Sequence, residues 1–150
     1  PGAHKILIAG NHEAFLNNLS YLRTFREECK SLDILFLEDE LVEIEGLKIY
    51  GTNNSFPHCS PDHFQGYYFE ENFWDKLPSE HIDILLTHGM PEMSSEQDLA
   101  CPELAKALQK RNDIKYCLCG HSHWDKGSYN FYSTTVINSS CINSPKIIQI

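Results

Sequence analysis

The sequence is poor in basic residues and in long hydrophobic runs. Lysine and arginine total 12 against 21 aspartates and glutamates, which gives a formal net charge of −9. Nonspecific binding to nucleic-acid polymers requires clustered basic side chains, so we expect no such partner. No apolar run approaches the ~20 residues that a membrane-spanning helix needs, so we expect no membrane partner either.

The sequence also shows no secretory signal. Six cysteines are present, and an even count would suggest disulfides in a small secreted protein: Cys29, Cys59, Cys101, Cys117, Cys119 and Cys141. A chain of 150 residues with 41% hydrophobic content can fold without disulfides. We therefore expect free thiols, a cytoplasmic protein and one domain over residues 1–150.

Apolar periodicity predicts an α/β fold. Short apolar runs predict strands at residues 5–9, 34–37, 82–87, 114–119, 131–137 and 146–150. Helical spacing predicts helices at residues 14–29, 70–76 and 102–111. Glu45 and Gly46 form a hairpin turn between two further strands, at 41–44 and 47–50. Residues 5–9 have the pattern of a central strand buried on both faces. Early alternation of strands and helices favours a layered α/β domain.

Polar residues of the kind that bind metals follow three of the predicted strands. They are Asn11, His12, His88, His121 and His123. In open α/β sheets, ligands bind beyond the carboxyl ends of the strands, so these residues are expected to converge. Imidazole nitrogens suit zinc, iron and related divalent ions, and a carboxamide adds an oxygen ligand. The pattern therefore predicts a divalent metal site.

The motifs "GNHE", "THG" and "GHSH", in this order, resemble the later signature motifs of the calcineurin-like metallophosphoesterases. The stretches "LKIYGT", "IDILLTHGMP" and "VINSSC" most resemble the metallophosphoesterase-domain-containing branch, which acts on phosphodiesters. The resemblance implies a layered β-sandwich flanked by helices. It also implies hydrolysis of a small phosphoester, such as a cyclic nucleotide, by water activated between two divalent ions of Mn, Fe or Zn.

The resemblance gives each motif residue a role. Asn11, His88 and His121 match ligands of the second metal, and His123 matches a ligand of the first. His12 matches the histidine that contacts the substrate phosphate and assists departure of the leaving group, and Asn11 also lies at the substrate. A histidine in this position can donate a proton near neutral pH.

Two motifs of the family do not occur in these residues. The family's Asp-x-His and Gly-Asp motifs supply carboxylates, including the one that bridges both metals, and neither is found in the sequence. We therefore expect an N-terminally truncated sandwich. Its partner is expected to be either the missing N-terminal segment or a second copy in a homo-oligomer. The 150 residues by themselves are expected to show little or no activity. Glu13 matches the acidic position of "GNHE", and we expect it to support a ligand rather than bind metal.

Two other functions remain open. A chain that keeps the fold without catalysis would be a scaffold or interaction protein, through unpaired strand edges. A structural zinc module would use Cys117, Cys119, His121 and His123, which alternate along one strand. Paired zinc cysteines are usually separated by two to four residues, so we favour small core residues for the two cysteines.

The polar stretch at residues 52–66 predicts a long functional loop, in which His58 and His63 are candidates for shaping substrate access. An aromatic cluster follows, and we expect most of it to pack in the core rather than stack on a nucleobase: Tyr67, Tyr68, Phe69, Phe73 and Trp74.

Overall fold

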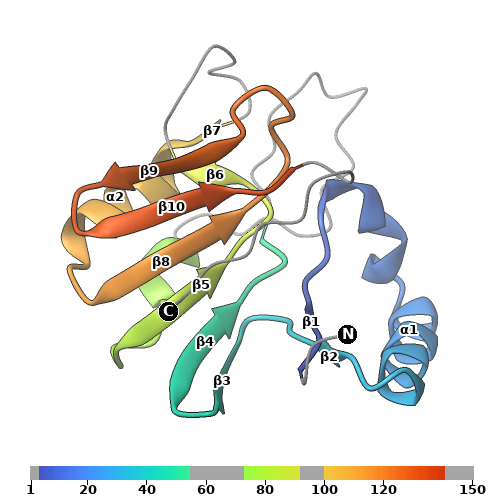
Figure 1. Ribbon diagram of the computed structural model, residues 1–150. Helices are drawn as coiled ribbons and strands as arrows, with labels where there is room; N and C mark the ends of the chain where they lie inside the picture. Colours follow the sequence, from blue (N-terminus) through green and yellow to red (C-terminus); the bar gives the residue numbers. More distant parts are fainter. Residues whose placement is uncertain (1–3, 55–72, 92–99, 141–150) are drawn as a thin grey trace.

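The main sheet has six strands in the order β3-β4-β5-β8-β10-β9 (Figure 1). The structure, a computed structural model, describes residues 4–54, 73–91 and 100–140. The inner strands β4, β5, β8 and β10 run parallel, and the outer strands β3 and β9 are antiparallel to their neighbours. The bounds are β3 Glu40–Ile44, β4 Leu47–Gly51, β5 Ile82–Leu86, β8 Ile114–Cys119, β9 Gly127–Phe131 and β10 Thr134–Asn138.

A second, two-stranded sheet pairs β1 (Ile6–Leu7) with β2 (Leu35–Phe36) in parallel. Figure 1 shows these strands together with helix α1 (Leu19–Ser31), to one side of the main sheet. The expectation that residues 5–9 form a central strand buried on both faces is wrong: among the described residues β1 pairs with β2, and Leu7 is 38% exposed. Ile6 and Ile8 pack toward the main sheet, and on the opposite side of the run only Ala9 joins the cluster with α1.

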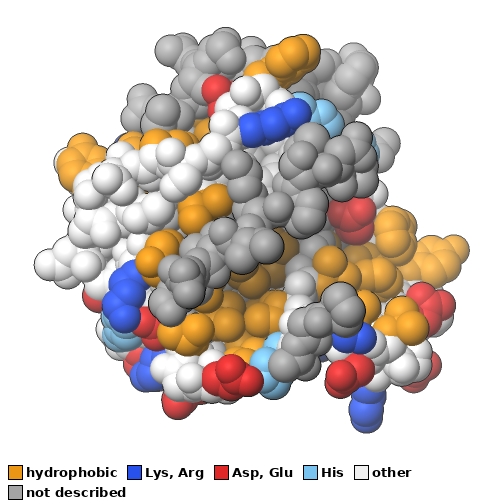
Figure 2. Space-filling view, viewed as in Figure 1, with side chains coloured by type: hydrophobic (Ala, Val, Ile, Leu, Met, Phe, Trp, Pro, Cys, Tyr) orange, Lys and Arg blue, Asp and Glu red, His pale blue; other side chains and the backbone are white. Residues whose placement is uncertain are grey.

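Three apolar clusters define the layers. One lies between the main sheet and helices α2 (Pro102–Lys110) and η2 (Phe73–Lys76). A second lies between the main sheet and the small sheet, where Figure 2 shows hydrophobic side chains. A third joins the small sheet to α1. The order is therefore helix, six-stranded sheet, two-stranded sheet, helix, which confirms the layered α/β prediction.

The helix predicted at residues 14–29 is divided at Asn18. A 3₁₀ helix, η1, covers Asn11–Asn17, and α1 begins at Leu19. The Asn18 Oδ1 atom accepts a hydrogen bond from the Ser20 backbone N–H at 2.9 Å, which caps the new helix. The backbone N–H of Asn18 bonds to Phe15 O at the end of η1, and the Asn18 side chain caps the start of α1, although the apolar spacing runs through both.

The predicted hairpin at Glu45 and Gly46 is confirmed. Both residues have positive φ, at 51° and 82°, as a two-residue turn between twisted strands requires. The single strand predicted at 131–137 is instead a second hairpin, β9 and β10, which turns at Tyr132 with φ of 53°. Two short paired strands, β6 (Met90–Pro91) and β7 (Ala100–Cys101), had no sequence prediction. The strand predicted at 146–150 lies outside the described residues.

Four cysteines are buried with free thiols, as expected: Cys29, Cys101, Cys117 and Cys119. Cys59 and Cys141 lie outside the described residues, as do His58, His63 and the aromatic residues at 67–69. Phe73 and Trp74 pack in the main core, which agrees with the packing interpretation. Among the described residues, no helix has the length and apolarity needed to cross a membrane.

At the amino end of β5, the buried carboxylate Asp83 fixes the pairing of three strands. It accepts hydrogen bonds from the Lys48 backbone N–H of β4 at 3.0 Å and from the Lys115 Nζ of β8 at 2.6 Å. His81 Nε2 lies 2.9 Å away. The hydrogen bond from Lys115 and then that from Lys48 hold the pKa of Asp83 well below its usual range.

We predict that Asp83→Asn lowers the free energy of unfolding at neutral pH. Because the folded-state pKa is depressed, the charged carboxylate stabilises the fold above its unfolded pKa of about 3.9, and this contribution is lost as pH falls further. Urea unfolding across this pH range should show the difference between the two proteins shrinking in acid. Asp75→Asn, at an exposed carboxylate, is the control. A difference that stays constant with pH would contradict the prediction.

Candidate metal centre

Three predicted ligands meet at the carboxyl ends of the strands. His88 follows β5, His121 follows β8, and Asn11 begins η1 just after β1. The His88 Nε2 atom lies 2.7 Å from Asn11 Oδ1 and 3.0 Å from His121 Nδ1. The two imidazole rings meet edge to face, with centroids 4.8 Å apart. Three donor atoms from segments far apart in sequence therefore form one cluster.

Backbone hydrogen bonds continue the main sheet past its strands and place the loops side by side. They are Thr52 N–H to Leu86 O, Thr87 N–H to Leu118 O, Gly120 N–H to His88 O and Ser139 N–H to Cys119 O. The loops after β4, β5, β8 and β10 thus keep the register of the parallel strands. This is why residues that follow different strands reach the same edge of the sheet.

Gly10 allows the end of β1 to approach the end of β5. A Cβ atom at this position would lie 2.6 Å from Nδ1 of His88, which is too close for any real contact. The Glu13 Oε2 atom accepts a hydrogen bond from the Gly10 backbone N–H at 2.8 Å and closes the turn that leads to Asn11. Glu13 therefore supports the Asn11 turn.

His121 has a left-handed backbone, with φ of 64°. Residues with side chains avoid this region, and such strain persists only where the surroundings enforce it. The buried Asn138, at the end of β10, provides that enforcement. Its Nδ2 donates to the carbonyl oxygens of Ser122 at 2.8 Å and of Asp125 at 2.9 Å. The loop that carries His121 and His123 is thereby tied to the sheet.

The electrostatic environment keeps His88 neutral. Burial is the main cause, and the positive charges of His121, His12 and His123 act in the same direction, so the pKa of His88 falls to about 4. His12 and His123 themselves have exposed side chains. Each is close in sequence to a member of the cluster, His12 to Asn11 and His123 to His121. A neutral imidazole is the form that binds metal ions.

The chemistry of the donor set fits a divalent ion. Two imidazole nitrogens and one carboxamide oxygen are an accepted mixture for zinc, iron or manganese. Ligands 2.0–2.1 Å from an octahedral ion are about 3 Å apart at neighbouring positions, close to the separations within this cluster. Across the described residues, no group of three His, Cys, Asp or Glu side chains forms a metal site. The cluster therefore depends on its asparagine as the third ligand.

The zinc-module alternative receives no support from the described residues. Cys117 and Cys119 belong to the core between the main sheet and α2, with exposed fractions of 0% and 7%. The hydrogen bond with the Cys117 thiol, followed by burial, raises the pKa of Cys119 well above its usual value. Both side chains lie in an apolar layer and behave as small core residues rather than metal ligands.

Sequence reasoning missed two buried asparagines near the cluster, Asn53 and Asn138. Asn138 lies in the stretch "VINSSC", and Asn53 lies in a polar run that reads as the start of a loop. Both are fully buried. An asparagine directly after an apolar strand was the available signal, but the same pattern is typical of ordinary turns.

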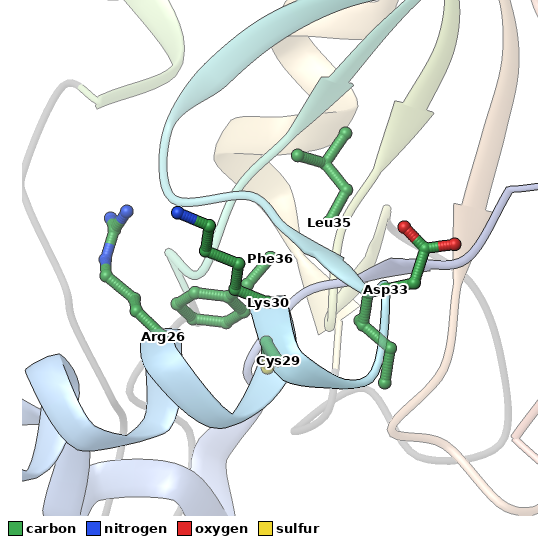
Figure 3. Close-up of a pocket in the computed structure, with 7 residues that line it drawn as sticks. Arg26, Cys29, Lys30, Asp33, Leu35 and Phe36 are labelled. Atoms are coloured by element: carbon green, nitrogen blue, oxygen red, sulfur yellow. The ribbon is translucent and has the colours of Figure 1, made fainter.

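A hollow of about 390 Å³ lies elsewhere, between the last turns of α1 and strand β2 (Figure 3). Arg26, Lys30 and Asp33 line it together with the apolar side chains of Leu35 and Phe36. Arg26 lies over the Phe36 ring at 5.7 Å and pairs with Glu38. None of the predicted site residues lines this hollow, and we assign no chemistry to it.

The fold and the cluster together define a class of protein, layered α/β domains whose candidate ligand residues follow the carboxyl ends of parallel strands. A sequence profile described as calcineurin-like phosphoesterase matches residues 2–125. The chain therefore belongs to the calcineurin-like phosphoesterase family, as the motifs "GNHE", "THG" and "GHSH" predicted.

Curated relatives carry the same family name or a related one. Metallophosphoesterase domain-containing protein 1 of Homo sapiens is 27% identical, over 100% of this chain and 56% of its own length. A UPF0046 protein of Caenorhabditis elegans is 31% identical, over 93% of this chain and 57% of its own. The chain thus spans a little over half the length of these relatives. The solved structure of TT1561 from Thermus thermophilus shares the fold, with a TM-score of 0.58, 15% identity, and coverage of 89% of this chain and 61% of that one.

We predict that Gly10→Ala displaces the His88 ring and weakens Zn²⁺ binding more than about tenfold, because the added methyl group occupies the space of the ring. Gly89→Ala is the matched control, since a Cβ there meets nothing within 4 Å. Calorimetric titration of both variants tests this. Equal affinities would show that the close approach of Gly10 does not position His88.

Proposed function

We propose that this chain forms part of a metal-dependent phosphoester hydrolase, with residues 1–150 as one domain. The observation that carries the proposal is the convergence of Asn11, His88 and His121 in a member of the calcineurin-like phosphoesterase family. We infer a phosphodiester, such as a cyclic nucleotide, as the substrate class. The name of the human relative supports the phosphoesterase function. Mn, Fe and Zn are the candidate ions.

The residues divide the work between holding an ion and moving a proton. Asn11, His88 and His121 hold one divalent ion, and His123 contributes to the ligands of a second. A bound ion supplies the positive charge that stabilises the phosphoryl oxygens as negative charge develops on them. His12, whose side chain is exposed, donates a proton or hydrogen bond to the oxygen of the leaving group, while Asn11 also contacts the substrate.

A noncatalytic protein on the same fold is the second candidate. Its support is that the 150 residues contain neither an Asp-x-His nor a Gly-Asp sequence. Without those carboxylates, the donor set of this chain consists of neutral ligands. Such a set binds zinc or iron in preference to Mg²⁺, which requires oxygen ligands. Metal binding and turnover are therefore separate questions for this chain.

The first test is metal binding. We predict that calorimetry near neutral pH detects one Zn²⁺ ion per chain and that His88→Ala weakens it more than about tenfold, because a central ligand is lost. His4→Ala is the matched control, since this exposed histidine contacts Glu45 at 3.0 Å, away from the cluster. Absence of Zn²⁺, Mn²⁺ and Fe²⁺ binding would overturn the proposed site.

The second test is turnover of a chromogenic phosphodiester with Mn²⁺. We predict no appreciable activity from the 150 residues alone, because a general acid such as His12 contributes only about 10²–10⁴-fold. Adding an upstream segment that carries Asp-x-His and Gly-Asp motifs should give activity, which His12→Ala then lowers. If the 150 residues alone are active and His88→Ala abolishes that activity, the carboxylates of the two motifs are not required, and the prediction is wrong. Continued inactivity of the extended chain would favour the noncatalytic protein.

A further inference from the structure

Asn53 is a fully buried polar residue at the end of β4 whose role the metal cluster leaves open. Its exposed fraction is 0%. Its Nδ2 atom is buried and has no hydrogen-bond partner among the described residues. Buried amide groups are nearly always paired, so an unpaired donor at this depth requires an explanation.

The orientation of the Asn53 carboxamide is fixed by its chemistry. The Oδ1 atom lies 2.6 Å from the backbone nitrogen of Ala9. A backbone N–H can only donate, so the side-chain atom that faces it must be the oxygen. The NH₂ group therefore points away from Ala9, and both of its hydrogens remain available.

Two independent connections place Asn53 beside the metal cluster. First, Gly51 of β4 and Leu86 of β5 are register partners in the parallel sheet. Asn53 follows Gly51 by two residues, and His88 follows Leu86 by two residues. Second, Asn53 binds Ala9, and the next residue, Gly10, packs against the His88 ring. The free NH₂ group thus belongs to the same edge of the sheet as the proposed ligands.

The chemistry of a free NH₂ group selects its partner. It can only donate hydrogen bonds, so it repels a metal ion and attracts an oxygen, most strongly a charged one. In a buried site of low dielectric this attraction is strengthened. Asn53 is thus suited to an anionic oxygen bound next to the ion held by Asn11, His88 and His121.

We propose that Asn53 is a substrate-binding residue whose Nδ2 donates a hydrogen bond to a phosphoryl oxygen. The proposal rests on the proposed phosphoester function for the identity of the ligand. Asn53 holds the end of β1 with its oxygen and contacts the phosphoryl group with its nitrogen. One side chain thereby links the position of Gly10 and Asn11 to the presence of the substrate.

The decisive experiment titrates inorganic phosphate into the chelator-treated, metal-free protein. We expect the side-chain NH₂ signals of Asn53 in nitrogen–proton NMR spectra to shift saturably with phosphate, and not with sodium chloride at matched ionic strength. Asn53→Asp keeps an oxygen for Ala9 and replaces the NH₂ by a negative oxygen. It should weaken phosphate binding, measured by calorimetry, at least about tenfold.

Asn130→Asp is the matched control for the change in charge, because Asn130 is exposed in β9. Equal weakening by both variants would show general repulsion and overturn the proposal. So would NH₂ signals that stay still while phosphate binds elsewhere, or no phosphate binding at all, which would mean that a buried water alone occupies the site. If Asn53→Asp does not fold, the phosphate-dependent shift of the Asn53 NH₂ signals in the wild-type protein tests the proposal by itself.

This outcome is separable from the test of the proposed function, because it uses no metal and no turnover. Phosphate that moves the Asn53 signals in a protein without zinc affinity would support an anion site and refute the metal centre. Zinc binding that depends on His88, with unmoved Asn53 signals, would keep the metal centre and refute the role of Asn53.

Discussion

The candidate site depends on one close approach, that of Gly10 against the ring of His88. Only a residue without a Cβ atom allows it, since an added Cβ would lie 2.6 Å from the imidazole. Through this contact the small sheet, which carries Asn11, reaches the main sheet, which carries His88 and His121. Apolar packing also joins the two sheets, and it fixes their separation but not the alignment of single polar atoms.

Buried asparagines supply the alignment that apolar packing lacks. Asn138 ties the loop after β8 to β10, and Asn53 ties the end of β1 to the end of β4. Each uses a directional hydrogen bond in a water-poor layer, where geometry is strictly determined. The left-handed backbone of His121 is kept in place by this arrangement. The same residues therefore account for the shape of the site and for its local strain.

Sequence patterns predicted the main sheet well where local signals were strong. The Glu45-Gly46 turn fixed the β3–β4 hairpin, and the apolar runs located β5 and β8 within a residue or so. They failed at β1, because an apolar run does not reveal which strands pair with it or whether both of its faces are covered. They also failed at Asn18, where a side-chain cap starts a new helix, and at Tyr132, where a positive φ turns the chain between β9 and β10.

The sequence by itself determined the family, the kinds of donor atom and their order along the chain. These follow from short motifs such as "GNHE" and "GHSH", whose residue types carry the chemistry wherever they lie. Only the tertiary structure decided that Asn11, His88 and His121 touch while His12 and His123 remain exposed. It alone revealed that the buried NH₂ group of Asn53 has no partner within the part of the chain that the structure describes. The reason is physical: contacts between residues distant in sequence depend on strand register and on how two sheets pack, which no local pattern encodes.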